Sequence, residues 1–261
     1  MEGWRVRAET ARQLSRLTGD FYARTSASFS ATRSAPWEGW EHVLAAAADA
    51  QGAPVGLRVL DLACGNLRFE RFLAEAWQPG RVEAFAVDAC DDLAAGVVPG
   101  VEVRYQHLDI VSELASGQGL ASSLDASDCD LCACFGFMHH LPLPEQRLQV
   151  LRVLVACARP GGVVAVSFWQ LSQSERLLRK AQETTAVAAQ RFGLNDLGPG
   201  DYLLGWQERD DVLRYCHDFS EAEIDELAKV VSSEAEEIAR FSADGASHNL
   251  NRYLLLKRRS C

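Results

Sequence analysis

The sequence predicts one α/β domain whose mostly parallel sheet has helices on both faces and ends in an antiparallel hairpin strand. Three observations predict it. An apolar run that begins at Leu57 ends in the acid Asp61 and a tight small-residue turn, and a helical pattern follows. Four more apolar runs alternate with helical patterns, which is typical of parallel strands joined by right-handed crossovers. Two strand-like runs then close the chain, joined by a short loop that contains Asp244 and Gly245.

Two helical segments precede the sheet, and five parallel strands are expected between Leu57 and Phe168. The spacing of apolar residues predicts one or two short helices between Arg5 and Tyr22, and the small, polar and aromatic residues of 26–40 predict a loop. Pro36 and Glu38 are typical of a helix start, so a helix is expected from Trp40 to Ala50. The parallel strands are expected at Leu57–Asp61, Val82–Val87, Val101–Tyr105, Leu131–Phe135 and Val163–Phe168.

The second half is expected to be mainly helical before the closing strands. The segment Ser112–Ser127, rich in Ser, Gly and Ala, predicts a flexible insert, and Gly193–Gly205 predicts a glycine-rich loop. Ser220 and Glu223 have the spacing of a helix capping box. Helices are expected at Glu145–Ala158, Ser172–Phe192 and Glu221–Val231, and the closing strands at Glu236–Phe241 and Asn251–Leu256.

Length and composition agree with a single domain. A chain of 261 residues with 48% hydrophobic residues can bury one full core. No apolar run is long enough for a transmembrane helix, so no membrane association is expected. The N-terminal residues lack the apolar core of a signal peptide, and eight cysteines without one are typical of reduced cytosolic thiols. We therefore expect a cytoplasmic protein, with the nucleus as an alternative.

The charge distribution is uneven. A net charge of −10 argues against broad, nonspecific binding of nucleic acid. The acids lie mainly in the middle of the chain, whereas Lys257, Arg258 and Arg259 make the C-terminal end basic. Arginines also gather near the start, at positions 5, 7, 12, 16, 24 and 33. This pattern fits an ordinary solvated surface or a local basic patch on an acidic body, and the sequence leaves both open.

Acidic residues follow the first three predicted strands. Asp61, Asp88 and Asp109 each lie at or just beyond a strand end, and those ends line one crevice in an open parallel sheet. An acid after the second strand suits two ribose hydroxyls, and an acid after the third can accept from the exocyclic amine of adenine. Each acid alone could instead satisfy the backbone of its turn. Three acids at the ends of successive strands favour a nucleoside-binding site.

The turn after the first strand narrows the choice of nucleoside. A dinucleotide needs several glycines so that the backbone can approach a pyrophosphate. Here Ala63 and Leu67 stand where further glycines would fall, which leaves Gly65 alone. Such a turn is poor for phosphates but suits S-adenosylmethionine (SAM), whose amino-acid tail brings no phosphate. Leu67 is expected to crowd the start of the following helix.

These motifs identify a resemblance that runs from Phe21 to Lys257. The chain resembles the class I SAM-dependent methyltransferases, which have a Rossmann-like seven-stranded sheet. Within them it is similar to the eukaryotic-type tRNA wobble-uridine (5-carboxymethyluridine) carboxyl methyltransferases. The class is carried by V-L-D-L-A-C-G-N (59–66), Asp88, Asp109 and R-P-G-G (159–162). The narrower family is carried by F-S-A-T-R-S-A-P-W (29–37), F-M-H-H-L (137–141), S-F-W-Q (167–170), D-Y-L-L-G-W-Q (201–207) and R-Y-C-H-D-F (214–219).

The chain departs from this family at several positions. The family has glycine where Ala63 and Leu67 stand, usually proline at Gly205 and usually tyrosine at Cys216. The segment 112–127 also looks longer than its counterpart. The departure at Cys216 puts the nucleobase contact in doubt, and those at 63 and 67 bear on the cofactor.

The resemblance implies methyl transfer from SAM to the carboxylate of a modified wobble uridine in tRNA, with S-adenosylhomocysteine (SAH) as product. A carboxylate is already ionised at pH 7, so the reaction needs in-line placement rather than a strong base. The resemblance also implies a small zinc-binding activator subunit. Two alternatives remain open: a small-molecule O- or N-methyltransferase of the same fold, and a non-catalytic tRNA-binding or scaffold protein with a degraded SAM site.

The resemblance and the strand ends together give the candidate site residues. Arg33 and Arg214 are expected to clamp a carboxylate, because a guanidinium fork matches its two oxygens, although both could be ordinary surface arginines. The expected catalytic residues are Arg33, His139, Arg214 and His217. The expected cofactor-binding residues are Asp61, Ala63, Cys64, Gly65, Asp88, Ala89, Asp109, Ile110, Phe135 and His140. The expected substrate-binding residues are Trp37, Trp169, Trp206 and Tyr215, although core packing explains Trp37 and Trp169 equally well.

No metal site is expected. His139 and His140 are adjacent on a loop, and no second group of ligands has a fitting spacing. The cysteines of C-D-L-C-A-C lie on a predicted strand, where Cys132 and Cys134 should point to one face and Cys129 to the other. Buried strand thiols explain them better than zinc.

We expect residues 1–261 to form one methyltransferase domain with four parts. They are an N-terminal helical arm or lid (1–52), a cofactor-binding core (53–170), a substrate-side helix and loop (171–219), and a C-terminal helix and hairpin (220–261).

Overall fold

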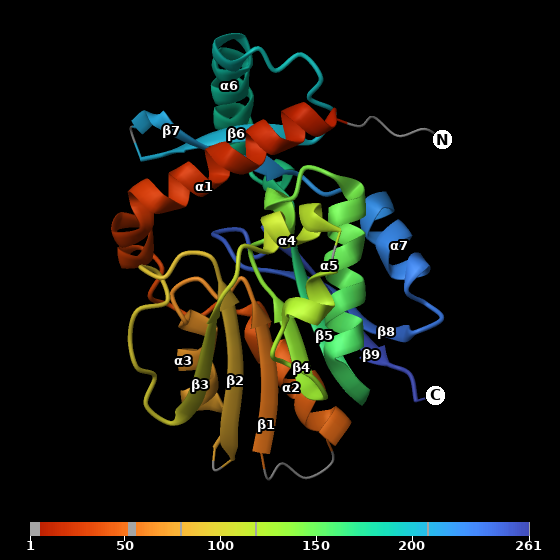
Figure 1. The fold of residues 1–261 in the computed structure, drawn as a ribbon. Coiled ribbons are helices and arrows are strands. Elements are labelled where there is room, and N and C mark those ends of the chain that lie inside the picture. Colours follow the sequence, from red (N-terminus) through yellow and green to blue (C-terminus); the bar gives the residue numbers. More distant parts are fainter. Residues whose placement is uncertain (1–5, 52–55, 79, 118, 208, 261) are drawn as a thin grey trace.

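The computed structural model describes residues 6–51, 56–78, 80–117, 119–207 and 209–260. Its centre is a seven-stranded sheet in the order β3-β2-β1-β4-β5-β9-β8 (Figure 1). The strands are β1 Gly56–Leu62, β2 Arg81–Asp88, β3 Val101–His107, β4 Cys129–Cys134, β5 Ala158–Trp169, β8 Ala235–Ala243 and β9 Asn251–Arg258.

The first five strands are parallel, and β9 runs antiparallel between β5 and β8. The mostly parallel α/β fold with an antiparallel C-terminal hairpin strand is therefore confirmed. The strand order reverses between β1 and β4, which makes their carboxyl ends the switch point where open α/β sheets bind ligands.

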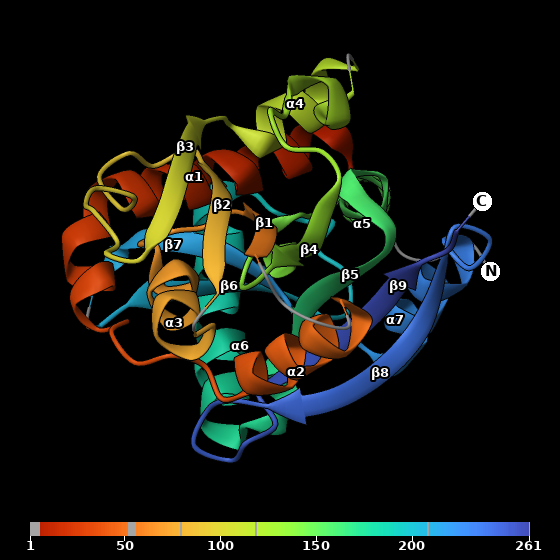
Figure 2. The same ribbon diagram turned by 90° about the horizontal axis from the view of Figure 1, so that it is seen from below.

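Helices cover both faces of the sheet, as predicted (Figure 2). On one face α2 (Gly39–Gln51) and α3 (Arg68–Ala76) bury residues such as Val43 and Leu73 against the strands. On the other face lie α4 (Ile110–Ser116), α5 (Pro144–Cys157) and α7 (Glu221–Val230), which pack a second core cluster. The predicted capping box is present, since the Ser220 hydroxyl and the Glu223 carboxylate each accept the backbone N–H of the other.

The N-terminal helix is longer than predicted. One helix, α1, runs from Ala8 to Ala31, so the expectation of short helices and of a loop from Ser26 is wrong up to Ala31. The hydroxyls of Thr25 and Ser28 donate to main-chain carbonyls within the helix, which satisfies side chains that otherwise favour loops. Phe21 and Phe29, two helical turns apart, pack edge-to-face and face the body of the protein.

A second, two-stranded sheet was not predicted. β6 (Asp201–Trp206) and β7 (Arg209–His217) pair antiparallel, with α6 (Glu175–Phe192) packed on β6 and α1 on β7. The expectation of a glycine-rich loop up to Gly205 is therefore wrong from Asp201 onward. Gly205 belongs to the hairpin, where a Cβ atom would lie 2.5 Å from the backbone oxygen of Arg209. Figure 1 shows α1, α6 and this sheet together above the carboxyl ends of the parallel strands.

Two local expectations also fail. The predicted flexible insert 112–127 contains most of α4 and a 3-10 turn (Leu120–Ser123), and it buries Leu120 and Ala126 in the core. In β4 the pairing with β5 shifts register between Cys129 and Leu131. Because of this irregularity Cys129 joins Cys132 and Cys134 in one core cluster instead of facing the opposite side. All three are buried thiols, as predicted.

No helix in the described part of the chain is long and apolar enough to cross a membrane.

Candidate functional site

A cavity of about 1490 Å³ lies between the carboxyl ends of the parallel strands and α1. We call its two sides the sheet half and the α1 half. The sheet half is lined by residues at or just after the carboxyl ends of β1, β2 and β3, namely Asp61, Ala63, Cys64, Gly65, Asp88, Ala89, Cys90, Asp109 and Ile110. The α1 half is lined mainly by Tyr22, Phe29, Arg33, Trp37, His139, His140, Trp169 and Arg214, and Phe135 lies between the halves. The structure thus brings most of the predicted site residues together.

The turn after β1 has an unusual backbone. Ala63, Gly65 and Leu67 all have positive φ values, of 67°, 55° and 57°. Ala63 lines the cavity, whereas the Leu67 side chain is 1% exposed and packs with Cys64 and Ala86 in a small core cluster. Leu67 therefore takes no room from the cavity. Ala63 and Leu67 are instead expected to carry backbone strain, because an L-residue in the left-handed region costs about 1–2 kcal/mol.

This strain can be measured by unfolding. Ala63→Gly is expected to raise the free energy of unfolding by roughly 0.5–1 kcal/mol, because glycine adopts a positive φ freely. Leu67→Gly is expected to lower it by about 2 kcal/mol, because the loss of a buried leucine outweighs the relieved strain. Urea denaturation of both variants checks this. A stabilising Leu67→Gly would contradict the packing described for that side chain.

Asp88 is held rigidly at the end of β2. One carboxylate oxygen accepts the backbone N–H of Gly65 at 2.8 Å, and the other accepts that of Cys90 at 2.9 Å. Burial raises the pKa of Asp88, although these N–H groups oppose the shift. Each oxygen keeps a further lone pair at the cavity wall, so the carboxylate can accept from two neighbouring hydroxyls.

Asp109 both caps a helix and lines the cavity. Its carboxylate accepts the backbone N–H of Ser112 at 3.1 Å and the Ser112 hydroxyl at 2.6 Å, and it forms the N-cap of α4. Asp88 and Asp109 can therefore accept backbone N–H groups of their turns and still present a carboxylate to a ligand. Ile110, the next residue, gives the same wall an apolar surface that suits a flat base.

Two arginines dominate the α1 half. The Arg214 side chain is buried, and its Nη1 atom has no hydrogen-bond partner. The guanidinium carbon lies over a set of aromatic rings, at centroid distances of 4.7 Å for Phe21, 5.7 Å for Phe29, 5.8 Å for Trp206 and 6.0 Å for Trp169. Arg33 lies 4.6 Å from the Phe29 ring centroid.

No ion pair neutralises Arg33 or Arg214 within the described ranges. Burial and the charge of Arg214 lower the pKa of Arg33, which shows that the two cations repel each other. Aromatic faces stabilise such cations only in part. The α1 half therefore holds uncompensated positive charge and is suited to an anion.

The histidines of this half are neutral. His140 Nδ1 lies 2.6 Å from the Tyr215 carbonyl oxygen, so it carries the proton and donates, and Nε2 then accepts the Tyr22 hydroxyl at 2.9 Å. Burial lowers the pKa of His140 to about 3 and raises that of Tyr22 to about 12. Burial also holds the pKa of His139 well below its usual range. Sequence reasoning missed Tyr22, which looks like any helical aromatic residue.

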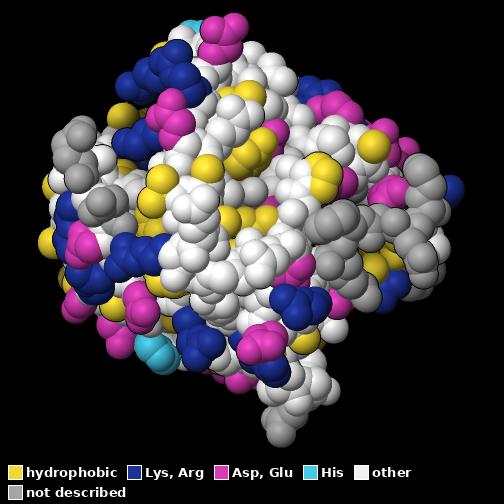
Figure 3. All heavy atoms as spheres, turned by 90° about the horizontal axis from the view of Figure 1, so that it is seen from above, with side chains coloured by type: hydrophobic (Ala, Val, Ile, Leu, Met, Phe, Trp, Pro, Cys, Tyr) yellow, Lys and Arg dark blue, Asp and Glu magenta, His cyan; other side chains and the backbone are white. Residues whose placement is uncertain are grey.

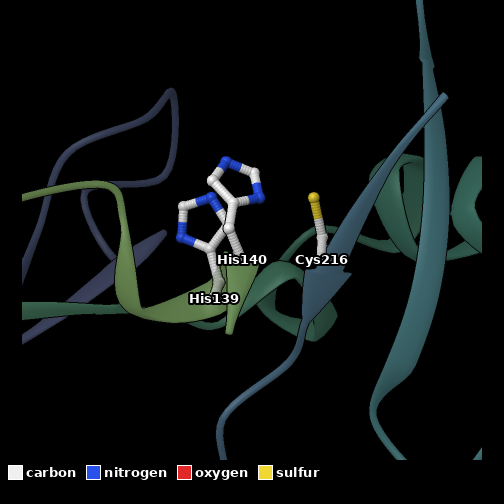
Figure 4. Close-up of side chains that lie close together, drawn as sticks. All are labelled: His139, His140 and Cys216. Carbon is white, nitrogen blue, oxygen red and sulfur yellow. The ribbon is translucent and has the colours of Figure 1, made fainter. Parts of the chain in front are cut away.

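His139, His140 and Cys216 lie close together, with ligand atoms within 4.8 Å of one another (Figure 4). The donor set does not fit a metal ion. Both ring nitrogens of His140 already have protein partners, and burial raises the pKa of the Cys216 thiol to about 11. Arg214 lies close enough to lower that pKa in part, which places a fixed cation beside the thiol. We assign the cluster to hydrogen bonding and packing.

Three predicted residues do not line the cavity: Trp206, Tyr215 and His217. Trp206 packs on Phe29 behind the arginines. The Tyr215 hydroxyl donates to Asp201 at 2.6 Å, and the two nitrogens of His217 lie 2.9 Å from Asp201 and 2.7 Å from Glu223. These bonds connect the small sheet to α7. The polar atoms of Tyr215 and His217 therefore have protein partners outside the cavity.

The comparisons with known proteins agree with this architecture. No model of a protein family matches the chain. Two curated proteins do, both named tRNA (carboxymethyluridine(34)-5-O)-methyltransferase ALKBH8. The Mus musculus protein is 26% identical over 175 residues, 67% of this chain, and the Macaca fascicularis protein is 27% identical over 174 residues, 63% of it. The chain spans 22% of the length of each.

Solved structures show the fold. An S-adenosylmethionine-dependent methyltransferase from Clostridium acetobutylicum superposes with a TM-score of 0.59 at 12% identity, covering 93% of this chain and 99% of that one. The 1,6-didemethyltoxoflavin-N1-methyltransferase of Burkholderia thailandensis, solved with S-adenosylhomocysteine, gives 0.56 at 16% identity, covering 96% and 91%. The predicted class I SAM-dependent methyltransferase fold is therefore confirmed.

Proposed function

We propose that this chain is a SAM-dependent methyltransferase that methylates the carboxylate of a 5-carboxymethyl-type wobble uridine in tRNA. The observation that carries the proposal is the pair of uncompensated arginines, Arg33 and Arg214, in the same cavity as the acids of the sheet half. The similarity to the two curated tRNA methyltransferases supports the choice of substrate.

The sheet half fits SAM. The fixed carboxylate of Asp88 would accept the two ribose hydroxyls of bound SAM, and Ile110 and Asp109 line the wall where the adenine would lie. The turn of Ala63 and Gly65 leaves room for the amino-acid tail. When bound, SAM supplies a methyl group on a sulfonium, which an anionic oxygen can attack in line.

The α1 half suits an acceptor that has no proton to lose. The pKa of His140 is about 3 and that of Tyr22 about 12, so neither exchanges protons readily near pH 7. A hydroxyl or ammonium acceptor would need a base, whereas a carboxylate is already ionised. Arg33 and Arg214 orient the carboxylate by forked hydrogen bonds.

We propose that binding of tRNA requires a partner subunit. On the face that carries α1, basic side chains alternate with acidic ones, and no broad basic field is visible (Figure 3). The net charge of −10 also opposes binding to a polyanion. A small activator subunit, which the family resemblance implies to bind zinc, would supply the missing positive surface in the cytoplasm.

A small-molecule methyltransferase is a second candidate. The favouring observation is that α1 and the residues around Arg214 enclose one side of the cavity, which suits an acceptor that enters whole. One of the superposed structures is named as the methyltransferase of a small heterocycle. A non-catalytic scaffold is a third candidate, since Ala63 and Leu67 replace glycines.

Mass spectrometry of tRNA distinguishes these candidates. Wobble nucleosides from cells lacking the protein should accumulate a free carboxymethyl group, and purified protein with SAM should convert it to a base-labile methyl ester. Calorimetry should detect SAM binding; its absence would favour the scaffold. Methylation of a small phenol or amine would favour the second candidate, provided that the wobble nucleosides of cells lacking the protein are unchanged and that purified protein forms no methyl ester on tRNA.

A further inference from the structure

Two buried carboxyl groups lie next to each other at the base of the cavity. Asp61, at the carboxyl end of β1, is 3% exposed and lines the cavity, and Glu70, in the first turn of α3, is 0% exposed. Their carboxyl groups lie within range of each other, so that each affects the pKa of the other. A hydrogen bond between two carboxyl groups requires a proton on one of them, because an ionised carboxylate only accepts.

No cation neutralises this pair within the part of the chain that the structure describes. The charge of Arg71 lowers the pKa of Glu70, but its guanidinium donates to the Asn66 carbonyl oxygen at 2.5 Å and not to the carboxyl group. Neither oxygen of Glu70 has a hydrogen-bond partner among the described residues. A buried polar group left in this way is costly, so it calls for an explanation.

The other groups that face the pair make a full double charge less favourable. Asp88 comes from β2, and the Cys64 and Cys134 thiols come from the turn after β1 and from β4. Burial raises the pKa of both carboxyls, with that of Glu70 at about 7 and that of Asp61 well above its usual range. Two adjacent carboxylates in a low-dielectric site cannot both stay ionised without a counter-ion.

We propose that Asp61 and Glu70 share one proton in the free enzyme and release it when the cationic methionine end of SAM binds, so that the pair becomes its counter-ion. The inference rests on the proposed function, because it needs SAM in this cavity. SAM carries an ammonium and a sulfonium at that end, and SAH carries the ammonium alone. Glu70 is thus a positioning residue that sets the charge of Asp61.

The first experiment uses the protein without cofactor. The folded pair holds a proton that the unfolded chain has lost above about pH 5, so the native state is favoured at low pH and loses this advantage as pH rises through 7. The melting temperature of the wild type should therefore fall between pH 5.5 and 7.5 relative to Glu70→Gln. Glu75→Gln, which removes an exposed charge from the same helix, should behave as the wild type.

The second experiment is calorimetry with SAM in buffers of different ionisation enthalpy. About half a proton should be released per SAM at pH 7, and the affinity should rise about eightfold from pH 6.0 to 7.5. Glu70→Gln should abolish both effects, and Glu75→Gln neither. Equal proton release with SAH would assign the effect to the ammonium, and release with SAM alone to the sulfonium.

The outcomes separate this inference from the proposed function. SAM binding of normal strength without proton release, or an unchanged pH dependence in Glu70→Gln, would overturn the shared proton. No binding of SAM or SAH at any pH would instead overturn the proposed function, while the melting experiment would still test the pair.

Discussion

Replacing Arg214 with alanine is expected to lower methyl transfer by two to three orders of magnitude and to leave SAM affinity within about threefold of the wild type. The guanidinium is buried in the α1 half, and its free Nη1 atom is available to hold an acceptor carboxylate. It does not touch Asp88 or the turn after β1, so the cofactor should bind normally. Single-turnover rates with tRNA and calorimetry with SAM measure the two effects separately.

The matched control for this variant is Arg24→Ala. Arg24 lies on α1 and pairs at the surface with Asp211 on β7, so its loss perturbs the same interface without touching the cavity. Arg214→Lys should recover only part of the rate, because an ammonium cannot form the forked pair. A parallel loss of SAM binding and transfer in Arg214→Ala would argue against an acceptor role.

Asp88→Ala is expected to weaken SAM binding by about a hundredfold or more. Two charge-assisted hydrogen bonds to the ribose are lost, each worth roughly 1.5–3 kcal/mol. The backbone N–H groups of Gly65 and Cys90 also lose their acceptor, which loosens the turn. Calorimetry measures the affinity, and Asp92→Ala, an exposed acid just beyond, should have no effect. Affinity within about threefold of the wild type would mean that the ribose assignment is wrong.

The sheet and the cofactor side could be predicted because their signals are local in the sequence. The strands of the large sheet are short apolar or alternating runs, and β8 and β9 flank the Asp244 loop. The acids at positions 61, 88 and 109 follow strand ends, and parallel topology alone brings those ends together. All three line the cavity.

The parts that sequence reasoning missed depend on contacts between distant segments. β6 and β7 are stabilised by the burial of Leu203 and Leu213 with Leu14 of α1. Glu70 reads as an ordinary helical acid, and only the packing of α3 under the sheet end reveals that it is buried beside Asp61. The face on which Cys129 lies was predicted wrongly, because the pairing of β4 with β5 is irregular at this residue. The alternation of side chains along a regular strand gives no sign of such an irregularity.

The docking of α1 on β7 has a consequence for synthesis on the ribosome. The Thr18 hydroxyl accepts the backbone N–H of Tyr215 at 3.0 Å, across 197 residues of chain. At a typical elongation rate the helix therefore waits roughly 10–40 s for its partner strand to be made. During that interval the face that carries Leu14 and Phe21, both 0% exposed in the finished fold, is open to chaperones. Contacts between residues far apart in the sequence are slow to form, and the α1 side of the cavity can therefore close only after β7 has been made.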